Sequence, residues 1–308
     1  MDYDTLIDAE TWAFIRETAS LYPDDAVALS VDQQRLAYDA MCLNFRQAHP
    51  EGVESEDISA DGVPCRVYEA GDPYITVVYF HGGGFVVGGL ESHDGVCAEI
   101  CARTGYRVVS VDYRLAPEYR HPAAFEDGWT ATNWVAETYE GPIVLAGDSA
   151  GGRIAAMVAH RARGHIKQIV GQVLIYPSLG GNLDAGSYIE HAHAPMLTRD
   201  DILFYEKITR EDGQSEVDPA VTPLLESDFS DLPPTVLITA DCDPVRDDCR
   251  NYSDCIRDAG GRVTWINEEG LVHGYLRARH SVARAQSSFD HILLAIESLG
   301  QRIWPYDD

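Results

Sequence analysis

The chain contains 308 residues, 45% of them hydrophobic, which is enough apolar material for one large core. Its 50 acidic and 23 basic residues give a formal net charge of −27, and this charge disfavours binding to nucleic acid or to an anionic membrane surface. Only two lysines occur, Lys167 and Lys207. An acidic, lysine-poor composition fits a saline habitat and fits an arginine-biased genome equally well, so both interpretations stay open.

The first ten residues, MDYDTLIDAE, are acidic and lack the apolar segment of a secretory signal. No apolar run reaches the length of a membrane span. The seven cysteines do not show paired metal-ligand spacing. Cys97 and Cys101 are four residues apart on a predicted helix, and we interpret them as small buried hydrophobes rather than a metal or redox pair. We therefore expect a cytoplasmic protein that needs no metal or other cofactor.

Two helices are predicted first, over 8–21 and 31–48, and Ser30 and Gln33 match a capping box at the start of the second. Short β-branched runs then predict strands. These runs are CRVYEA (65–70), ITVVYF (75–80), YRVVSVDY (106–113), GPIVLAG (141–147), IVGQVLIYP (169–177), PTVLITAD (234–241) and RVTWIN (262–267). Segments of helical length, 92–104, 122–140, 150–163, 245–259 and 279–299, separate most of them.

This alternation predicts an α/β fold with a mainly parallel sheet covered by helices on both faces. Within SADGVP, the Asp61-Gly62 pair lies between two strand-like runs and predicts an antiparallel hairpin at one edge. Residues 178–232 are too many for a simple connection and contain a predicted helix near 198–209. We expect this insertion and the N-terminal helices to cover the carboxyl edge of the sheet, where open α/β sheets place ligands.

Residues 147–151, GDSAG, form a G-x-S-x-G motif between a predicted strand and a predicted helix. A serine on such a sharp turn exposes its hydroxyl, and the flanking glycines permit close backbone approach. The motif alone arises by chance, but the strand before it and the helix after it favour a nucleophile at Ser149. The helix also brings its positive dipole end close to this serine.

A serine hydroxyl needs an oriented base to act as a nucleophile. Of the eleven histidines, His273 lies in the loop after the last predicted strand, from which it can reach the carboxyl edge of the sheet. His191 and His193 are interpreted as parts of a solvated loop, because no further ligand pattern supports a metal site.

Asp243 is the predicted partner of this histidine, because it follows another strand in the loop before the next helix. Asp247 and Asp248 fall within that helix, where carboxylates favour the first turn. The chain order Ser149, Asp243, His273 is the order found in α/β-hydrolases.

The stretch YFHGGGFVVGG, residues 79–89, follows a predicted strand. Three successive glycines remove side chains where backbone N–H groups would face a developing negative charge. A flexible glycine loop is the alternative, but the position upstream of a G-x-S-x-G motif favours an oxyanion hole. The stretch matches neither common phosphate-binding glycine pattern.

The motifs HGGGFVVG, DYRLAPE (112–118), GDSAGG, DPVRDD and HGY, in this order, resemble those of the bacterial hormone-sensitive-lipase-like family of α/β-hydrolases, which includes acetyl esterases and short-chain carboxylesterases. The resemblance implies an α/β-hydrolase fold whose mostly parallel central sheet is flanked by helices and covered by a helical cap. It implies N-terminal cap helices in 1–52, a cap insertion in 178–232 and a catalytic domain formed by 53–177 and 233–308.

By this resemblance Ser149 would be the nucleophile, His273 the general acid and base, and Asp243 its orienting carboxylate. The backbone N–H groups of Gly83, Gly84 and Ala150 would bind the oxyanion.

The resemblance also gives supporting roles to His81 and Asp148 near the site, and to Arg114 and Glu118 in YRLAPE. Arg153 and Cys249 depart from the family pattern, which often has asparagine and glycine at these positions.

Phe85, Tyr176 and Leu271 lie next to the predicted site in sequence and are candidate pocket residues, although they fit a core equally well. The expected partner is a small-molecule ester, and similar proteins suggest a homodimer. No nucleic acid and no stable membrane association are expected.

We therefore predict a serine carboxylesterase that hydrolyses short-chain acyl esters. An amidase or arylformamidase would use the same three residues and stays an alternative. A non-catalytic binding protein on this scaffold is a second alternative, although such proteins usually lack one member of the triad. A lipase acting at oil interfaces is disfavoured by the acidity and by the absence of an apolar surface helix.

Overall fold

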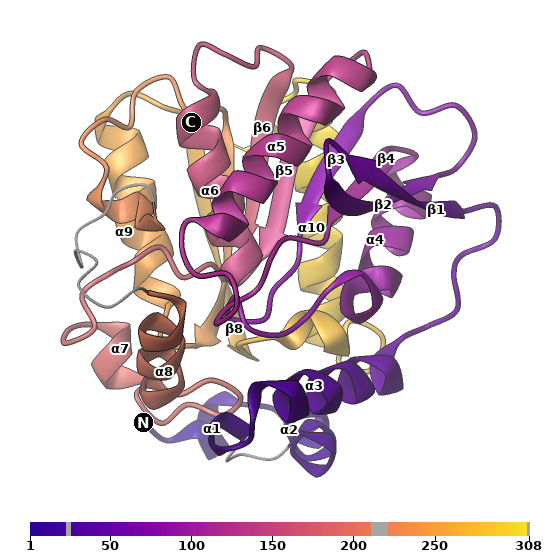
Figure 1. Ribbon diagram of the computed structural model, residues 1–308. Helices are drawn as coiled ribbons and strands as arrows, with labels where there is room; N and C mark the ends of the chain where they lie inside the picture. Colours follow the sequence, from indigo (N-terminus) through magenta and orange to yellow (C-terminus); the bar gives the residue numbers. More distant parts are fainter. Residues whose placement is uncertain (23–25, 211–220, 307–308) are drawn as a thin grey trace.

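The centre of the molecule is an eight-stranded sheet, seen in a computed structural model that describes residues 1–22, 26–210 and 221–306 (Figure 1). Its strands are β1 Glu54–Ala60, β2 Val63–Glu69, β3 Thr76–Phe80, β4 Arg107–Val111, β5 Ile143–Asp148, β6 Ile169–Ile175, β7 Thr235–Cys242 and β8 Val263–Val272. Their order is β1-β2-β4-β3-β5-β6-β7-β8. Strands β3 to β8 are parallel to one another, whereas β2 is antiparallel to both of its neighbours, β1 and β4, so the predicted α/β architecture is confirmed.

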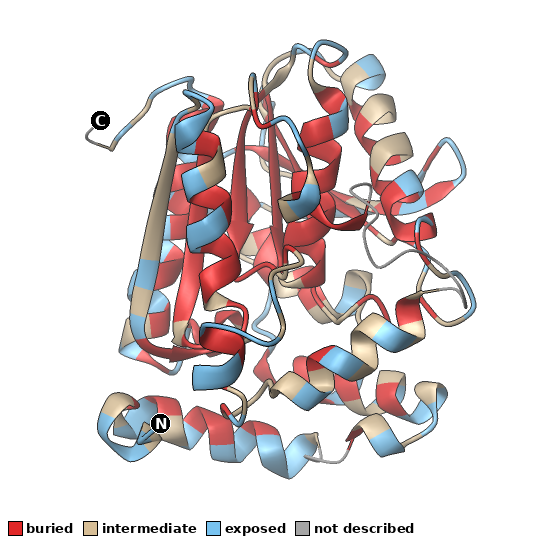
Figure 2. Ribbon diagram, turned by 90° about the vertical axis from the view of Figure 1, so that its left-hand side faces the viewer, coloured by how far each residue is buried: buried red, intermediate tan, exposed pale blue. Residues whose placement is uncertain are grey.

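Helices cover both faces of this sheet, which explains why β3 and β4 are buried at every position. The helices are α1 Tyr3–Leu6, α2 Ala9–Leu21, α3 Val31–Phe45, α4 Leu90–Thr104, α5 Ala123–Thr138, α6 Ala150–Ala162, α7 Ser187–Glu190, α8 Arg199–Thr209, α9 Arg246–Asp258 and α10 Ala283–Gly300, with short 3₁₀ turns η1 Ala26–Ala28, η3 Pro223–Leu225 and η4 Tyr275–Ala278. Helices α5, α6 and α9 pack on one face, and α4 and α10 pack on the other (Figure 1). Figure 2 shows the burial concentrated in the sheet and in the helix faces against it.

Two local sequence signals have the predicted structures. Asp61 and Gly62 both have positive φ, 50° and 94°, and form the two-residue turn between β1 and β2. Ser30 caps α3 by accepting from Gln33 N at 3.3 Å, while the Gln33 side chain accepts from Ser30 N at 3.1 Å. The hairpin and the capping box are therefore confirmed.

Helices from two distant parts of the chain lie together below the carboxyl edge of the sheet (Figures 1 and 2). They are α1 to α3 from the N-terminus and α7 and α8 from the segment after β6. We call this group the cap. The N-terminal part is fixed to the end of the chain, because Glu10 accepts from Ala283 N at 2.8 Å and Asp8 pairs with Arg284 at 3.1 Å.

One histidine of the cap has a different environment from the one predicted. His191 is 1% exposed, and its ring nitrogens contact Tyr3 Oη at 3.2 Å and Arg246 Nη1 at 3.1 Å. The prediction of a solvated loop is therefore wrong for His191, because side chains from two remote segments cover it. His193 is exposed.

Asp248 also does more than favour the first turn of α9. Its carboxylate is buried and accepts from Leu179 N at 2.7 Å, Gly180 N at 3.1 Å and Tyr188 Oη at 2.9 Å. It therefore fixes the point where the chain leaves the sheet and enters the cap.

Cys97 and Cys101 are completely buried on α4 and form no disulfide, as predicted. Burial raises the pKa of the Cys101 thiol to about 11. Within the described ranges, no helix has both the length and the apolar character needed to cross a membrane.

Candidate active site

Ser149 occupies the turn between β5 and α6. Its backbone has φ 52° and ψ −119°, an unusual conformation for a residue with a side chain. The neighbouring backbone is too close for side chains, since a Cβ on Gly151 would lie 2.0 Å from Phe80 O and one on Gly147 would lie 2.5 Å from Gly151 C. The glycines of the motif therefore allow the sharp turn that presents the Ser149 hydroxyl.

The structure brings Ser149, His273 and Asp243 together in one line of hydrogen bonds. Ser149 Oγ lies 2.9 Å from His273 Nε2, and His273 Nδ1 lies 2.6 Å from Asp243 Oδ2. Asp243 is fully buried and also accepts from Val245 N at 3.0 Å. The three residues follow β5, β7 and β8, which are parallel, so their loops meet at the same edge of the sheet.

The glycine loop after β3 lies beside this line. Val86 N and Val87 N both donate to Gly83 O at 3.0 Å, which closes a tight turn. Gly83 has φ +129°, and a Cβ there would lie 2.0 Å from Val87 O. A Cβ on Gly84 would lie 2.6 Å from the Tyr205 ring, so the loop passes directly against the cap helix α8. Gly83, Gly84 and Ala150 share one cavity with Ser149.

Asp148 holds the glycine loop through hydrogen bonds of its buried carboxylate. It accepts from Gly82 N at 3.0 Å, from Tyr79 Oη at 2.8 Å and from His93 Nε2 at 3.2 Å. Burial by itself would raise the pKa of Asp148, but the charge and hydrogen bond of His93 and the Tyr79 hydroxyl lower it to about 2. Asp148 is therefore ionised at neutral pH. The sequence analysis assigned no role to His93, because nothing local marks it as a carboxylate partner.

His81 fixes the start of the same loop as a neutral ring. It is fully buried, its Nδ1 lies 2.8 Å from Gly82 O, and it stacks on Tyr113 at a centroid distance of 4.2 Å. Burial lowers the pKa of His81 to about 3. Tyr113 Oη donates to His81 O at 2.7 Å.

The YRLAPE segment is tied to its surroundings by two arginines. Arg114 donates to Asp127 from Nε and Nη2, each at 2.8 Å in its shortest contact. Glu118 pairs with Arg35 of α3 at 2.7 Å, and Arg35 Nε also donates to Val86 O at 2.9 Å. Arg35, which the sequence analysis did not single out, therefore connects the cap to the glycine loop.

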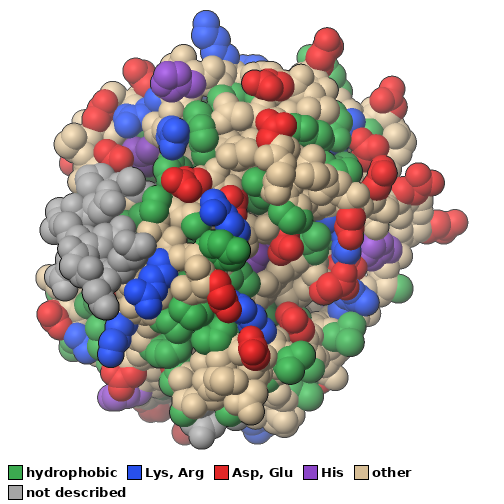
Figure 3. All heavy atoms as spheres, in the orientation of Figure 1, with side chains coloured by type: hydrophobic (Ala, Val, Ile, Leu, Met, Phe, Trp, Pro, Cys, Tyr) green, Lys and Arg blue, Asp and Glu red, His purple; other side chains and the backbone are tan. Residues whose placement is uncertain are grey.

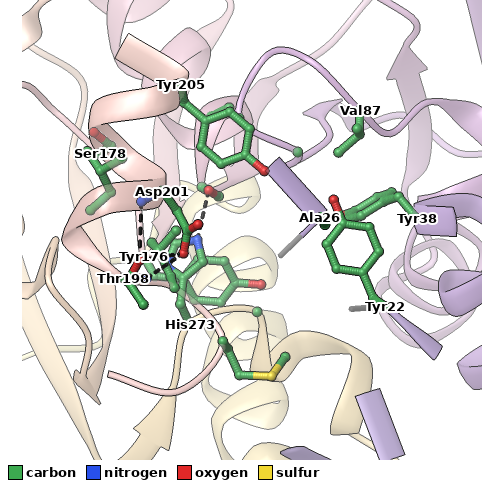
Figure 4. Close-up of a pocket in the computed structure, with 18 of the residues that line it drawn as sticks. Tyr22, Ala26, Tyr38, Val87, Tyr176, Ser178, Thr198, Asp201, Tyr205 and His273 are labelled. Atoms are coloured by element: carbon green, nitrogen blue, oxygen red, sulfur yellow. Dashed lines mark hydrogen bonds between the residues drawn. The ribbon is translucent and has the colours of Figure 1, made fainter. Parts of the chain in front are cut away.

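A cavity of about 550 Å³ opens over Ser149 and His273. The cap supplies much of its wall, and Figure 4 shows Tyr22 and Tyr38 side by side, with Tyr205 projecting from α8. Phe85 and Tyr176 also line it, as expected from the sequence. Leu271 does not: it is 1% exposed and belongs to the core cluster, because on β8 it packs between sheet and helices.

Comparison with known proteins identifies the family of this chain. A family model described as the alpha/beta hydrolase fold matches residues 77–277. Esterase LipI of Mycobacterium tuberculosis is 39% identical over 273 residues, covering 82% of this chain and 84% of LipI. The chain belongs to the hormone-sensitive-lipase-like family of α/β-hydrolases.

Two further members of this family show how far the similarity extends. Carboxylesterase NlhH of M. tuberculosis is 37% identical over 261 residues, covering 80% of this chain and 82% of NlhH. The structure of a hyperthermophilic esterase from the archaeon Pyrobaculum calidifontis has a TM-score of 0.87 and 32% identity, covering 96% of this chain and 99% of that one.

Arg153 is the departure from the family pattern that lies nearest the site. One helical turn after Ser149, it is 1% exposed and lines the cavity. It donates to Val221 O at 2.5 Å and to Glu206 Oε1 of α8 at 2.7 Å. Burial raises the pKa of Glu206, but Arg153 and Arg210 outweigh it and lower the pKa overall. The second departure, Cys249, is fully buried in the core.

Among the residues outside the gaps in the structure, no cluster of three or more His, Cys, Asp or Glu side chains is arranged to hold a metal ion. The groups that meet at the site are a hydroxyl, an imidazole and a carboxylate, with backbone amides beside them.

Proposed function

We propose that this carboxylic ester hydrolase cleaves short-chain acyl esters with Ser149 as nucleophile, His273 as general acid and base, and Asp243 as the carboxylate that orients it. The observation that carries the proposal is the continuous hydrogen-bond line from Ser149 Oγ through His273 to Asp243, at 2.9 and 2.6 Å, beside a cavity. A serine hydroxyl is a weak nucleophile at neutral pH, and it is activated by an adjacent base that a third group orients.

In the first half of the reaction, Ser149 Oγ attacks the ester carbonyl carbon while His273 Nε2 takes the hydroxyl proton. Asp243 accepts from His273 Nδ1 and stabilises the positive charge that forms on the ring. The carbonyl oxygen becomes an oxyanion next to the N–H groups of Gly83, Gly84 and Ala150. Each such donor contributes roughly 3 kcal/mol to lowering the barrier.

The first half ends when His273 gives its proton to the departing alkoxide, so that an alcohol leaves and Ser149 is acylated. A water molecule then transfers a proton to His273 as its oxygen attacks the acyl carbon. Collapse of this second intermediate returns the proton to Ser149 Oγ and releases the acid.

The proposed preference for short acyl chains is supported by the bulky side chains that line the cavity. Its volume of about 550 Å³ is within the range of small-molecule sites. Bulky cap side chains, Tyr22, Tyr38 and Tyr205, limit how far a chain can extend beyond the reacting carbon.

Replacing Ser149 by Ala tests the assignment directly. Turnover of p-nitrophenyl butyrate should fall by at least about 10⁴-fold, because the nucleophile is lost, while the circular dichroism spectrum stays unchanged. Ser55→Ala, at an exposed position on β1, is the matched control and should keep full activity. A serine-directed organophosphate should add to residue 149, as detected by mass spectrometry. Substantial turnover by the Ser149→Ala protein would refute the assignment.

Chain length is tested with p-nitrophenyl esters from acetate to laurate. We expect kcat/KM to be greatest for the shorter members and to decline as the acyl chain outgrows the cavity. A maximum at laurate would contradict the proposed preference. Matched ester and anilide substrates in the same assay measure how strongly the site prefers esters over amides.

A further inference from the structure

Arg277 is a charged side chain in the cavity that the proposed reaction does not use. It lies in η4, four residues after His273, and lines both the 550 Å³ cavity and a small adjoining hollow of about 20 Å³. Its Nε is buried without a hydrogen-bond partner among the described residues. Two other arginines with little exposure have carboxylate partners, Arg153 with Glu206 and Arg279 with Glu99, both at 2.7 Å. Within the described ranges, Arg277 has none.

Gly274 and Tyr38, which lie next to this guanidinium, carry no charge that would neutralise it. It rests on the backbone of Gly274, where an added Cβ would lie 2.8 Å from Nη2 and 3.3 Å from Nη1 and Cζ. The ring of Tyr38 lies 5.9 Å from Cζ, a cation–π distance. Gly274 directly follows His273, so the guanidinium occupies the part of the wall next to the reacting groups.

The acidic side chains of the cavity are already engaged elsewhere. Glu206 pairs with Arg153, and Asp201 Oδ2 accepts from Thr198 N and Oγ1 at 2.9 and 2.7 Å. Asp148 lines both hollows but binds Gly82, Tyr79 and His93. Arg277 therefore presents donors that no described carboxylate uses.

We propose that Arg277 binds a carboxylate of the substrate, so that the site is selective for half-esters of dicarboxylic acids. A guanidinium is always charged, and its planar fork matches the two oxygens of a carboxylate. Hydrogen bonds to a charged group in a partly desolvated cavity are stronger than in water, and a buried donor left without a partner is costly. The inference rests on the ester hydrolysis proposed above and specifies its substrate.

The negative surface of the protein does not favour anionic substrates, so selectivity for them requires a positive group inside the cavity. Asp and Glu side chains are scattered over the face shown in Figure 3, and the net charge of −27 does not attract anions over long distances. Recognition of an anionic ester must therefore come from a contact inside the cavity.

The test compares monomethyl adipate, which carries a carboxylate at one end, with dimethyl adipate, which carries a neutral methyl ester there, with hydrolysis followed by NMR. In Arg277→Met the ratio of kcat/KM for the half-ester over the diester should fall about tenfold or more, as expected for loss of a charged hydrogen bond. Arg277→Lys should retain part of the ratio because the charge remains. The matched control is Arg262→Met, at an exposed position near the opposite end of β8. Succinate and glutarate half-esters determine the best spacing.

An unchanged ratio in Arg277→Met would overturn the inference, as would an equal loss of activity on both substrates, which indicates a structural role only. If that variant is too unstable to purify, Arg277→Gln measures the same ratio.

Binding without turnover separates this inference from the proposed reaction. Free adipate or glutarate should raise the thermal midpoint of the Ser149→Ala protein, and the rise should disappear in Ser149→Ala/Arg277→Met. If Ser149→Ala still hydrolyses esters but this pattern holds, the nucleophile is wrong and the carboxylate site remains. If no dicarboxylate raises the midpoint, the carboxylate site is wrong.

Discussion

At the scale of single residues, Ser149 and Asp148 are adjacent in the chain but have different roles. The Ser149 hydroxyl contacts His273, whereas the Asp148 carboxylate accepts from β3, from the glycine loop and from α4. A sharp turn separates the two side chains. The same turn that exposes the hydroxyl therefore buries a carboxylate that positions Gly82 and the loop beyond it.

Replacing Asp148 by Asn should damage both stability and activity. Asparagine has nearly the shape of aspartate, but the buried partner of His93 loses its charge. The free energy of unfolding should therefore fall by about 3 kcal/mol. Because Gly82 shifts, kcat should fall more than KM changes. Urea denaturation and steady-state kinetics measure the two effects. A variant with the stability and kcat of the parent would contradict the positioning role.

The effect of Asp148→Asn on the free energy of unfolding should depend on pH in one direction. The pKa of Asp148 is about 2 in the folded protein against an ordinary value of 3.8, so the unfolded chain takes up this proton first on acidification. Its contribution to stability is complete above about pH 4 and is lost between about pH 4 and 2. The difference in unfolding free energy between parent and Asp148→Asn should therefore be constant from pH 7 to 5 and shrink below pH 4. A difference that grows on acidification would show the assignment of this pKa to be wrong.

At the scale of elements, Arg153 and Glu206 join α6, which begins next to Ser149, to the cap helix α8. Both side chains have little exposure, 1% and 16%, so their charges are screened weakly. Val221 O holds Arg153 Nε from the segment where the chain returns from the cap. The pair therefore holds α8 of the cap close to the start of α6, where Ser149 lies.

Glu206→Gln should lower the free energy of unfolding by about 3 kcal/mol, because Arg153 keeps its charge and loses its counter-ion. KM should rise as α8 and Tyr205 move. Asp290→Asn, which breaks the exposed pair with Arg103 at 52% and 55% exposure, is the control and should cost less than about 0.5 kcal/mol. Equal effects of the two substitutions in urea denaturation would count against a structural pair between α6 and α8.

The sequence predicts those elements whose signals are local. Apolar runs mark β3 and β4, the Asp61-Gly62 pair marks the hairpin, and chain order singled out the three residues that meet at the site. Burial that depends on contacts between remote segments could not be predicted from local sequence patterns. His191 is covered by Tyr3 and Arg246, and whether Leu271 faces the core or the cavity depends on how β8 packs.

At the scale of the whole molecule, charge is the dominant feature. With 50 acidic and 23 basic residues, the folded chain concentrates like charges that are more widely spaced when it unfolds. Salt shortens the reach of this repulsion, from about 30 Å at 0.01 M to about 8 Å at 0.15 M.

The thermal midpoint should therefore rise by a few degrees between about 0.01 and 0.15 M NaCl, as measured by calorimetry. KCl at the same concentrations should give the same rise if screening is the cause. A midpoint that falls with salt would mean that attractive surface pairs outweigh the net repulsion.

The docking of the first helices on the last has a consequence for how the protein folds. Phe14 and Ile15 of α2 are buried in the core, and Asp8 and Glu10 contact residues 283–284. Phe14 packs on Phe45 of the neighbouring helix α3, with ring centroids 5.3 Å apart, whereas the contacts of Asp8 and Glu10 join segments that are far apart in the sequence. Contacts of such high sequence separation close a long loop, so we expect the docking of α2 on α10 to be a late step of folding.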